Sequence, residues 1–97
     1  MKIKTKSGFV CDVNPNKAKD WSFCKMLAKC DSQDGSAILE GMTFVVPFLL
    51  GEDGETKLVK HVMDEDGIAP VDKIMAEFRE ILQLMGKETK KSQSSQK

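Results

Sequence analysis

The first thirteen residues alternate between the two faces of a strand. Residues that suit a buried face recur at every second position on either side of a turn sequence: Ile3, Thr5, Phe9, Cys11 and Val13. This period of two is typical of a strand with one wet face. Gly8 lies between the two runs, where it can take the positive φ of a tight turn. The pattern predicts a β-hairpin that ends at Asn14-Pro15, because proline has no amide proton for a strand ladder.

A helix is expected over residues 20–30, with Asp20 able to cap its first turn. Its apolar positions form one stripe and the residues that widen it: Trp21, Cys24, Leu27 and Ala28, then Phe23, Met26 and Cys30. Lys25 and Lys29 are four residues apart, which places both on one side of the helix. We therefore expect this helix to bury one broad apolar face and to turn its lysines to solvent.

Residues 37–51 form the most apolar part of the chain. Their apolar positions leave almost no polar side: Ile38, Leu39, Met42, Val45, Val46, Leu49 and Leu50. Thr43–Leu50 suits a buried strand as well as a helix, and Pro47 would disrupt an interior helical hydrogen bond. We expect a core helix that is kinked or broken near Pro47 and closed by Gly51 in a left-handed conformation.

Two further helices complete the pattern. The first opens with Glu52-Asp53-Gly54-Glu55, whose acidic side chains suit the positive end of a helix dipole, and ends at residues 64–67, Asp-Glu-Asp-Gly. Its buried positions are Leu58, Val59, Val62 and Met63. The second starts at Pro70 and has one apolar stripe: Val71, Ile74, Met75, Phe78, Ile81, Leu82 and Met85. This spacing is typical of an amphipathic helix with one buried face.

The predicted fold is mainly α (α+β), with an N-terminal β-hairpin followed by about four helices that pack as a small bundle. Residues 1–86 would form a single globular domain, since a chain of 97 residues has room for one core. Residues 87–97 contain no apolar side chain. They cannot offset the entropy of ordering, so a disordered polar tail is expected there.

Positive and negative charges balance over the chain but are separated along it. The 15 basic and 15 acidic residues leave no net charge. Residues 1–30 carry a net charge of +5, residues 31–86 carry −8, and residues 87–97 carry +3. A molecule with this balance gives no reason to expect nucleic acid or an anionic membrane as its main partner.

The sequence has no recognisable targeting or membrane segment. Residues 1–6 are rich in lysine, and no apolar segment of a signal peptide follows them. The longest apolar run, Thr43–Leu50, is far shorter than the roughly 20 residues of a bilayer-spanning helix. The three cysteines cannot all pair, and thiols need no bridge in a reducing compartment. We expect a cytoplasmic protein whose cysteines are small core residues.

No motif for nucleophilic catalysis or zinc binding is complete. His61 is the single histidine, and no family signature of a Cys/His nucleophile pair surrounds it. A histidine that faces solvent beside Lys57 and Lys60 is the preferred interpretation. The residues with zinc-ligand chemistry are Cys11, Cys24, Cys30 and His61. Because no two of them stand in a CxxC or HxxxH motif, we expect no metal site. Because no nucleophile signature is present either, we do not expect an enzyme.

The run Asp64-Glu65-Asp66-Gly67 is similar to the acidic-glycine part of a calcium loop. An EF-hand would require oxygen ligands at two further positions, which here are Val62 and Lys73. We interpret the run as a helix end with Gly67 as its cap. No cofactor is expected.

The order of the features is more specific than any single motif. A hairpin with Ser7-Gly8 at its turn precedes a helix introduced by Asp20-Trp21, and an apolar helix ends in the sequence Phe-Leu-Leu-Gly-Glu of residues 48–52. Residues 66–70, Asp-Gly-Ile-Ala-Pro, lead into an amphipathic helix with Ala76-Glu77-Phe78 and then a Lys/Ser tail. Over residues 2–92 this order resembles the small tail assembly chaperones of long-tailed bacteriophages and prophages.

The resemblance implies a protein that binds the long tape-measure protein and keeps it soluble while tail-tube subunits assemble around it. Such a protein works in the bacterial host cytoplasm and is absent from the finished particle. In this family a programmed frameshift often produces a longer version, and Lys90-Lys91 is where a slippery run of adenines would lie.

Three residues of the apolar stripes are candidate contacts with hydrophobic tape-measure segments: Phe44, Phe48 and Met85. This hypothesis requires that parts of the stripes are exposed. Ordinary burial of all three in the core is the alternative. For the chain as a whole, the alternative function is a small prophage-encoded regulator that binds a host protein or DNA, with the basic ends contacting phosphates.

Overall fold

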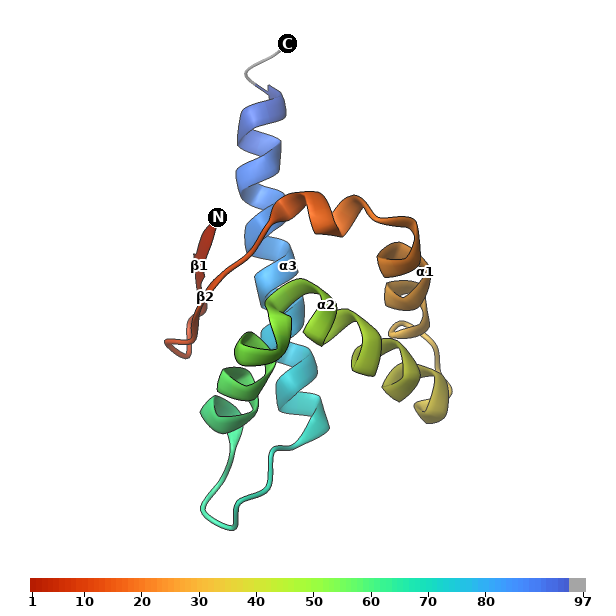
Figure 1. The fold of residues 1–97 in the computed structure, drawn as a ribbon, viewed down its shortest axis with the longest axis vertical. Coiled ribbons are helices and arrows are strands. Elements are labelled where there is room, and N and C mark those ends of the chain that lie inside the picture. Colours follow the sequence, from red (N-terminus) through yellow and green to blue (C-terminus); the bar gives the residue numbers. More distant parts are fainter. Residues whose placement is uncertain (95–97) are drawn as a thin grey trace.

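The computed structural model describes the backbone of residues 1–94 and the side chains of residues 1–87. Two short strands come first, β1 (Lys2–Lys4) and β2 (Val10–Asp12), followed by a 3-10 helix, η1 (Pro15–Lys19). The α-helices are α1 (Trp21–Lys29), α2 (Gly35–Val62) and α3 (Val71–Ser94). Figure 1 shows α3 as the long axis, with the hairpin on its left, α1 on its right and α2 across its front. The predicted mainly helical fold with an N-terminal hairpin is confirmed.

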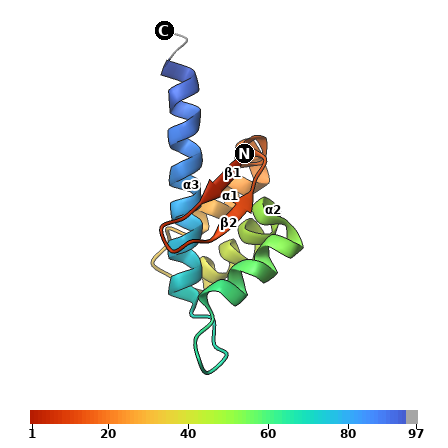
Figure 2. The same cartoon turned by 90° about the vertical axis from the view of Figure 1, so that its left-hand side faces the viewer.

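The hairpin forms as the alternating pattern predicts. β1 and β2 are antiparallel, with Ile3 opposite Cys11, and Gly8 takes a φ of 94° at the turn. The buried residues of this segment are Ile3, Thr5, Phe9 and Val13. β1 contacts α3 and β2 contacts α2, so the hairpin closes one side of the core, as Figure 2 shows.

α1 begins where predicted but buries a different face. The Asp20 carboxylate accepts a hydrogen bond from the Phe23 amide at 3.0 Å, which makes Asp20 the N-cap. Phe23 and Cys30 are buried. The remaining apolar stripe of α1 faces solvent: Trp21, Cys24 and Ala28. The prediction of one broad buried face was wrong, because the apolar residues form two stripes on opposite sides of the helix and α2 covers only one of them.

α2 is one long helix with a break at Gly51. Residues 43–50 are helical, which excludes the strand alternative for Thr43–Leu50. The non-helical residue is Gly51 (φ 78°, ψ 168°), so the predicted kink near Pro47 was wrong. Pro47 removes one backbone donor, whereas Gly51 takes a conformation that is essentially restricted to glycine. Its φ is positive, as predicted, but its ψ differs from that of a left-handed cap.

This break accounts for the number of helices. We expected about four, and the predicted third helix is the second half of α2, so the described residues form three α-helices. The two halves of α2 run in different directions (Figure 1). Their angle shapes the pocket described below.

α3 extends further than predicted. Gly86 lies inside the helix, which continues to Ser94, past residue 86 where the globular domain was expected to end. Lysine, glutamate and glutamine follow Gly86 and are good helix formers. Helical backbone therefore replaces the unstructured tail expected from residue 87 up to Ser94. Residues 95–97 lie outside the described part of the chain, where the predicted disorder stays a prediction.

The core forms where α1, α2, α3 and the hairpin meet. Its largest fully buried side chains are Phe23, Val45, Leu58 and Ile81. By length and composition α2 would also suit a membrane, a test that the core helix of a globular domain can pass equally. Seven residues of α2 are buried, and the break at Gly51 lies within the helix.

Candidate functional site

A hydrogen-bonded cluster joins the hairpin turn to both long helices, and we call it the hairpin clamp: Thr5, Ser7, His61 and Glu77. Glu77 Oε1 accepts hydrogen bonds from the hydroxyls of Thr5 (2.8 Å) and Ser7 (2.9 Å). Ser7 Oγ also lies 2.8 Å from His61 Nε2. The turn, the last part of α2 and α3 are therefore held together by one polar network.

The sequence predicts part of the clamp but not its contacts. His61 is exposed, as predicted, yet its ring lies 5.4 Å from the ring of Phe9. Ser7 and His61 are 54 positions apart, a separation that no local pattern can bridge. The available signal was Thr5, because a hydroxyl on the buried face of a strand needs a hydrogen-bond partner.

The clamp does not have the geometry of a catalytic triad. In a triad the imidazole accepts the proton of the nucleophile, and a carboxylate orients the imidazole. Here Glu77 accepts the Ser7 proton directly, so His61 Nε2 acts as a donor to Ser7 Oγ. The arrangement fixes the hairpin turn against the helices.

Replacing Glu77 with alanine is expected to lower the free energy of unfolding by about 1–3 kcal/mol, because the buried Thr5 hydroxyl loses an acceptor. Urea unfolding followed by circular dichroism measures the change. Gln83→Ala is the control, since Gln83 is an exposed residue of the same helix and should change stability by less than about 0.5 kcal/mol. Equal losses in the two variants would contradict the role of the clamp.

The three cysteines are free thiols in different surroundings. Cys30 is buried and Cys11 half-buried, but Cys24 is exposed on the outer stripe of α1, so its prediction as a core residue was wrong. Burial, with a smaller effect of the adjacent aspartates, raises the pKa of the Cys11 and Cys30 thiols. Less thiolate at neutral pH makes both poorer nucleophiles and metal ligands. Within the described residues, no group of three His, Cys, Asp or Glu could hold a metal ion.

The acidic run after α2 forms hydrogen bonds with the backbone of its own loop. Asp64 Oδ1 accepts hydrogen bonds from the amides of Asp66 (2.9 Å) and Ile68 (3.0 Å). Gly67 has a φ of 79°, which favours glycine. These contacts close the loop between α2 and α3 as an Asx turn does. The helix ends just before this run with Met63 as its C-cap, so the prediction of Gly67 as the cap was wrong.

Two of the three candidate contact residues lie near the surface. Phe44 and Phe48 are half-buried and stack with ring centroids 5.5 Å apart. The Phe48 ring also lies 5.7 Å from the ring of Phe23, and the Lys17 ammonium lies 5.7 Å from its centroid. Met85 is only 4% exposed. Its assignment required exposure and was wrong, because Met85 continues the buried stripe of α3.

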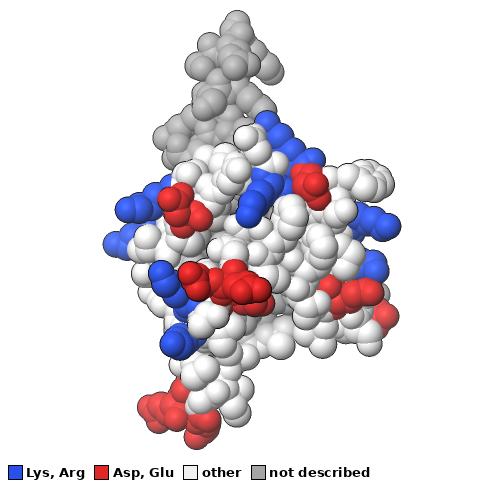
Figure 3. All heavy atoms as spheres, viewed as in Figure 1, with Lys and Arg blue, Asp and Glu red and all other residues white. Residues whose placement is uncertain are grey.

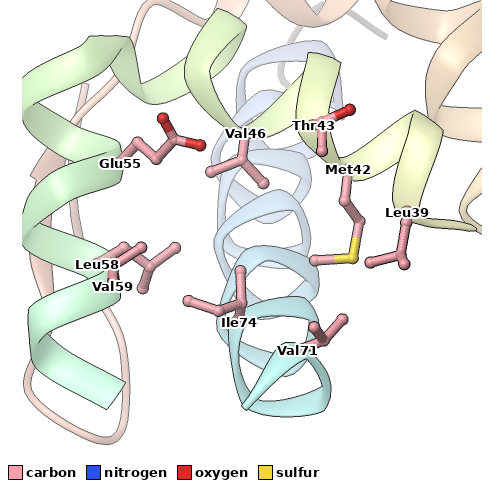
Figure 4. A pocket seen from close by; sticks show the side chains of 9 residues that line it. All are labelled: Leu39, Met42, Thr43, Val46, Glu55, Leu58, Val59, Val71 and Ile74. Carbon is pink, nitrogen blue, oxygen red and sulfur yellow. The ribbon is translucent and has the colours of Figure 1, made fainter. Parts of the chain in front are cut away.

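An apolar pocket lies between the two halves of α2 and the start of α3, and we call it the α2–α3 pocket (Figure 4). Its volume is about 150 Å³. The lining side chains include Leu39 and Val46 before the break, Glu55 and Val59 after it, and Val71 and Ile74 from α3. Glu55 carries the single charge among them.

The break at Gly51 gives this pocket its shape, because it turns the second half of α2 away from the first. Leu39 and Val71 remain 47% and 48% exposed, although the sequence pattern places both in buried stripes. Figure 3 shows uncharged surface on this side of the molecule beside several acidic groups, one near the middle of the view and another at the bottom, where the α2–α3 loop lies. The pocket could not be predicted from the sequence, since it depends on where the helix bends.

A second apolar surface is the outer stripe of α1. Trp21 is 78% exposed, the most of any large apolar residue in the described part of the chain. Cys24 and Ala28 follow it on the same side of the helix. A large exposed aromatic residue of this kind is typical of binding surfaces.

Comparison of the sequence with models of protein families finds no match. Comparisons with curated proteins and with solved structures also find no match. The case for a function therefore depends on the surfaces of the molecule and on the order of its sequence features.

Proposed function

We propose that this chain is a tail assembly chaperone of a long-tailed bacteriophage or prophage. It binds the tape-measure protein in the host cytoplasm while tail-tube subunits assemble, and it has no enzymatic role. The observation that carries the proposal is the α2–α3 pocket, an apolar hollow whose rim residues Leu39 and Val71 are about half exposed. Hollows of this kind favour protein binding, and the resemblance in the order of sequence features supplies the class of partner.

A chaperone for hydrophobic segments needs apolar surfaces that remain accessible in the folded state. The pocket and the outer stripe of α1 supply two such surfaces. Phe44 and Phe48 are further candidate contacts, because their half-buried rings can pack against a partner. Met85 is no longer a candidate.

The distribution of charge supports a defined orientation of the partner. The segment that forms α2, the α2–α3 loop and α3 as far as residue 86 carries most of the net charge of −8, whereas residues 1–30 carry +5. Complementary charges across an interface steer association and fix its register. Basic parts of a partner would therefore lie over α2 and α3.

Co-expression with the tape-measure protein encoded by the same genome tests the proposal. We expect the soluble fraction of the tape-measure protein to rise and the two proteins to purify together. An unrelated aggregation-prone protein is the control, and its solubility should not change. Unchanged solubility of the tape-measure protein, or a salt-sensitive gel shift with duplex DNA in its place, would overturn the proposal in favour of a regulator.

A further inference from the structure

We propose that the α2–α3 pocket holds one bulky apolar side chain, phenylalanine or leucine, from an amphipathic helix of the partner. A lysine or arginine one turn away on that helix pairs with Glu55. The tape-measure protein as the source of this helix depends on the proposed function. The chemistry of the pocket does not.

The volume of the pocket sets the size of its occupant. An apolar cavity of about 150 Å³ holds one benzene molecule, whereas pockets for drug-sized ligands have about 300–1,000 Å³. The α2–α3 pocket has about 150 Å³. It therefore suits a single ring or branched aliphatic side chain that enters from outside, as the anchor residue of a helix does in a hydrophobic groove.

The charge around the pocket sets the sign of the partner. Glu55 is the charged residue that lines it, and Figure 4 shows this side chain reaching over one end of the hollow from the second half of α2. Lys57 and Lys60 lie on the other side of the same half helix, away from the pocket. Asp72 adds a negative charge in the first turn of α3. A basic side chain beside the apolar anchor therefore finds a carboxylate and no competing cation among the lining residues.

The spacing of the apolar anchor and the basic residue on the partner helix follows from the short distance between the apolar wall of the pocket and Glu55. Glu55 and the apolar wall belong to one pocket, so the anchor and the basic residue must lie on one face of the partner helix. Residues three or four positions apart meet this condition. The chain's own residues 87–97 contain no apolar side chain and cannot supply the anchor.

The direct test is a titration of the isotope-labelled protein with two synthetic amidated peptides, followed by NMR of its methyl groups. The first peptide is an amphipathic helix of leucine and lysine with one phenylalanine on its apolar face. The second has glutamate in place of each lysine. We expect the lysine peptide to bind more tightly and to shift the resonances of Val59, Val71 and Ile74.

Two variants and a matched control separate charge from shape. Glu55→Lys should weaken binding of the lysine peptide about tenfold and improve binding of the glutamate peptide. Asp53→Lys makes the same charge change at an exposed residue that does not line the pocket, and should change binding less than about twofold. Val71→Trp, at the exposed rim, should fill the pocket and weaken both peptides. Circular dichroism confirms that each variant is folded.

Several results would overturn this proposal. These are equal affinity for the two peptides, equal effects of Glu55→Lys and Asp53→Lys, or shifts confined to the surroundings of Trp21. Self-association of the protein that Trp21→Ala abolishes would mean that Trp21 of a second copy occupies the pocket. This result would overturn the proposal as well.

Co-purification with the tape-measure protein separates this proposal from the proposed function. If Glu55→Lys and Val71→Trp bring down the tape-measure protein as well as the wild type does, the pocket assignment fails and the chaperone function stands. If the lysine peptide occupies the pocket but no tape-measure protein co-purifies, the pocket assignment stands and the chaperone function fails.

Discussion

Replacing Phe23 with alanine is expected to lower the free energy of unfolding by about 3–5 kcal/mol. The Phe23 side chain is 1% exposed, and its ring lies 5.7 Å from the ring of Phe48 across the contact between α1 and α2. Truncation would leave a cavity that two helices can close only in part. Because the total stability of a domain is about 5–15 kcal/mol, the variant should unfold at a much lower urea concentration.

Trp21→Ala is the matched control, since it removes a larger side chain only two positions away. Trp21 is mostly exposed, so its loss should change stability by less than about 0.5 kcal/mol. Urea unfolding of both variants, followed by circular dichroism, measures the difference. A larger loss for Trp21→Ala than for Phe23→Ala would mean that α1 buries the opposite stripe.

Replacing Gly41 with alanine is expected to destabilise the fold by about 1–3 kcal/mol. A Cβ atom at Gly41 would lie 2.5 Å from the Met26 carbonyl oxygen and 2.9 Å from Cys30 Sγ. The carbonyl belongs to the backbone of α1 and cannot rotate away as a flexible side chain can. α1 must therefore move away from α2, which loosens the contact that Phe23 also stabilises.

Gly86→Ala provides the control for this substitution and should have the opposite sign. Gly86 lies inside α3, and a Cβ atom there would meet nothing within 4 Å. Alanine in a helix interior is more favourable than glycine by about 0.5–1 kcal/mol. Thermal unfolding of the two variants gives the comparison. Destabilisation by both, or by neither, would contradict the close approach of α1 and α2 at Gly41.

The parts of the fold that local patterns determine could be predicted. The period of two before Val13 predicted the hairpin, and the aspartate before Trp21 predicted the cap of α1. The apolar stripe of α3 was also correct at Phe78, which is buried. Each of these features depends on residues that are close in sequence, so one segment contains the information needed.

Features that depend on distant segments could not be predicted. Apolar residues occur on two sides of α1, and only the position of α2 decides that Phe23 is covered and Trp21 is not. The break lies at Gly51 and not near Pro47. The helix tolerates the missing amide donor of Pro47, whereas Gly51 has a non-helical conformation that is essentially restricted to glycine. Of the candidate site, the sequence identified Phe44 and Phe48, which lie near the surface in the structure. It did not predict the pocket, because the pocket depends on the bend of α2.

Amide hydrogen exchange of this chain, alone and mixed with the tape-measure protein, tests most directly whether this proposed partner binds through the α2–α3 pocket. We predict slower exchange in residues 39–46, 55–59 and 71–74, which carry the lining side chains. Exchange elsewhere in the described residues should change little. Slower exchange confined to the outer stripe of α1 or to the hairpin, with these three segments unchanged, would contradict the account.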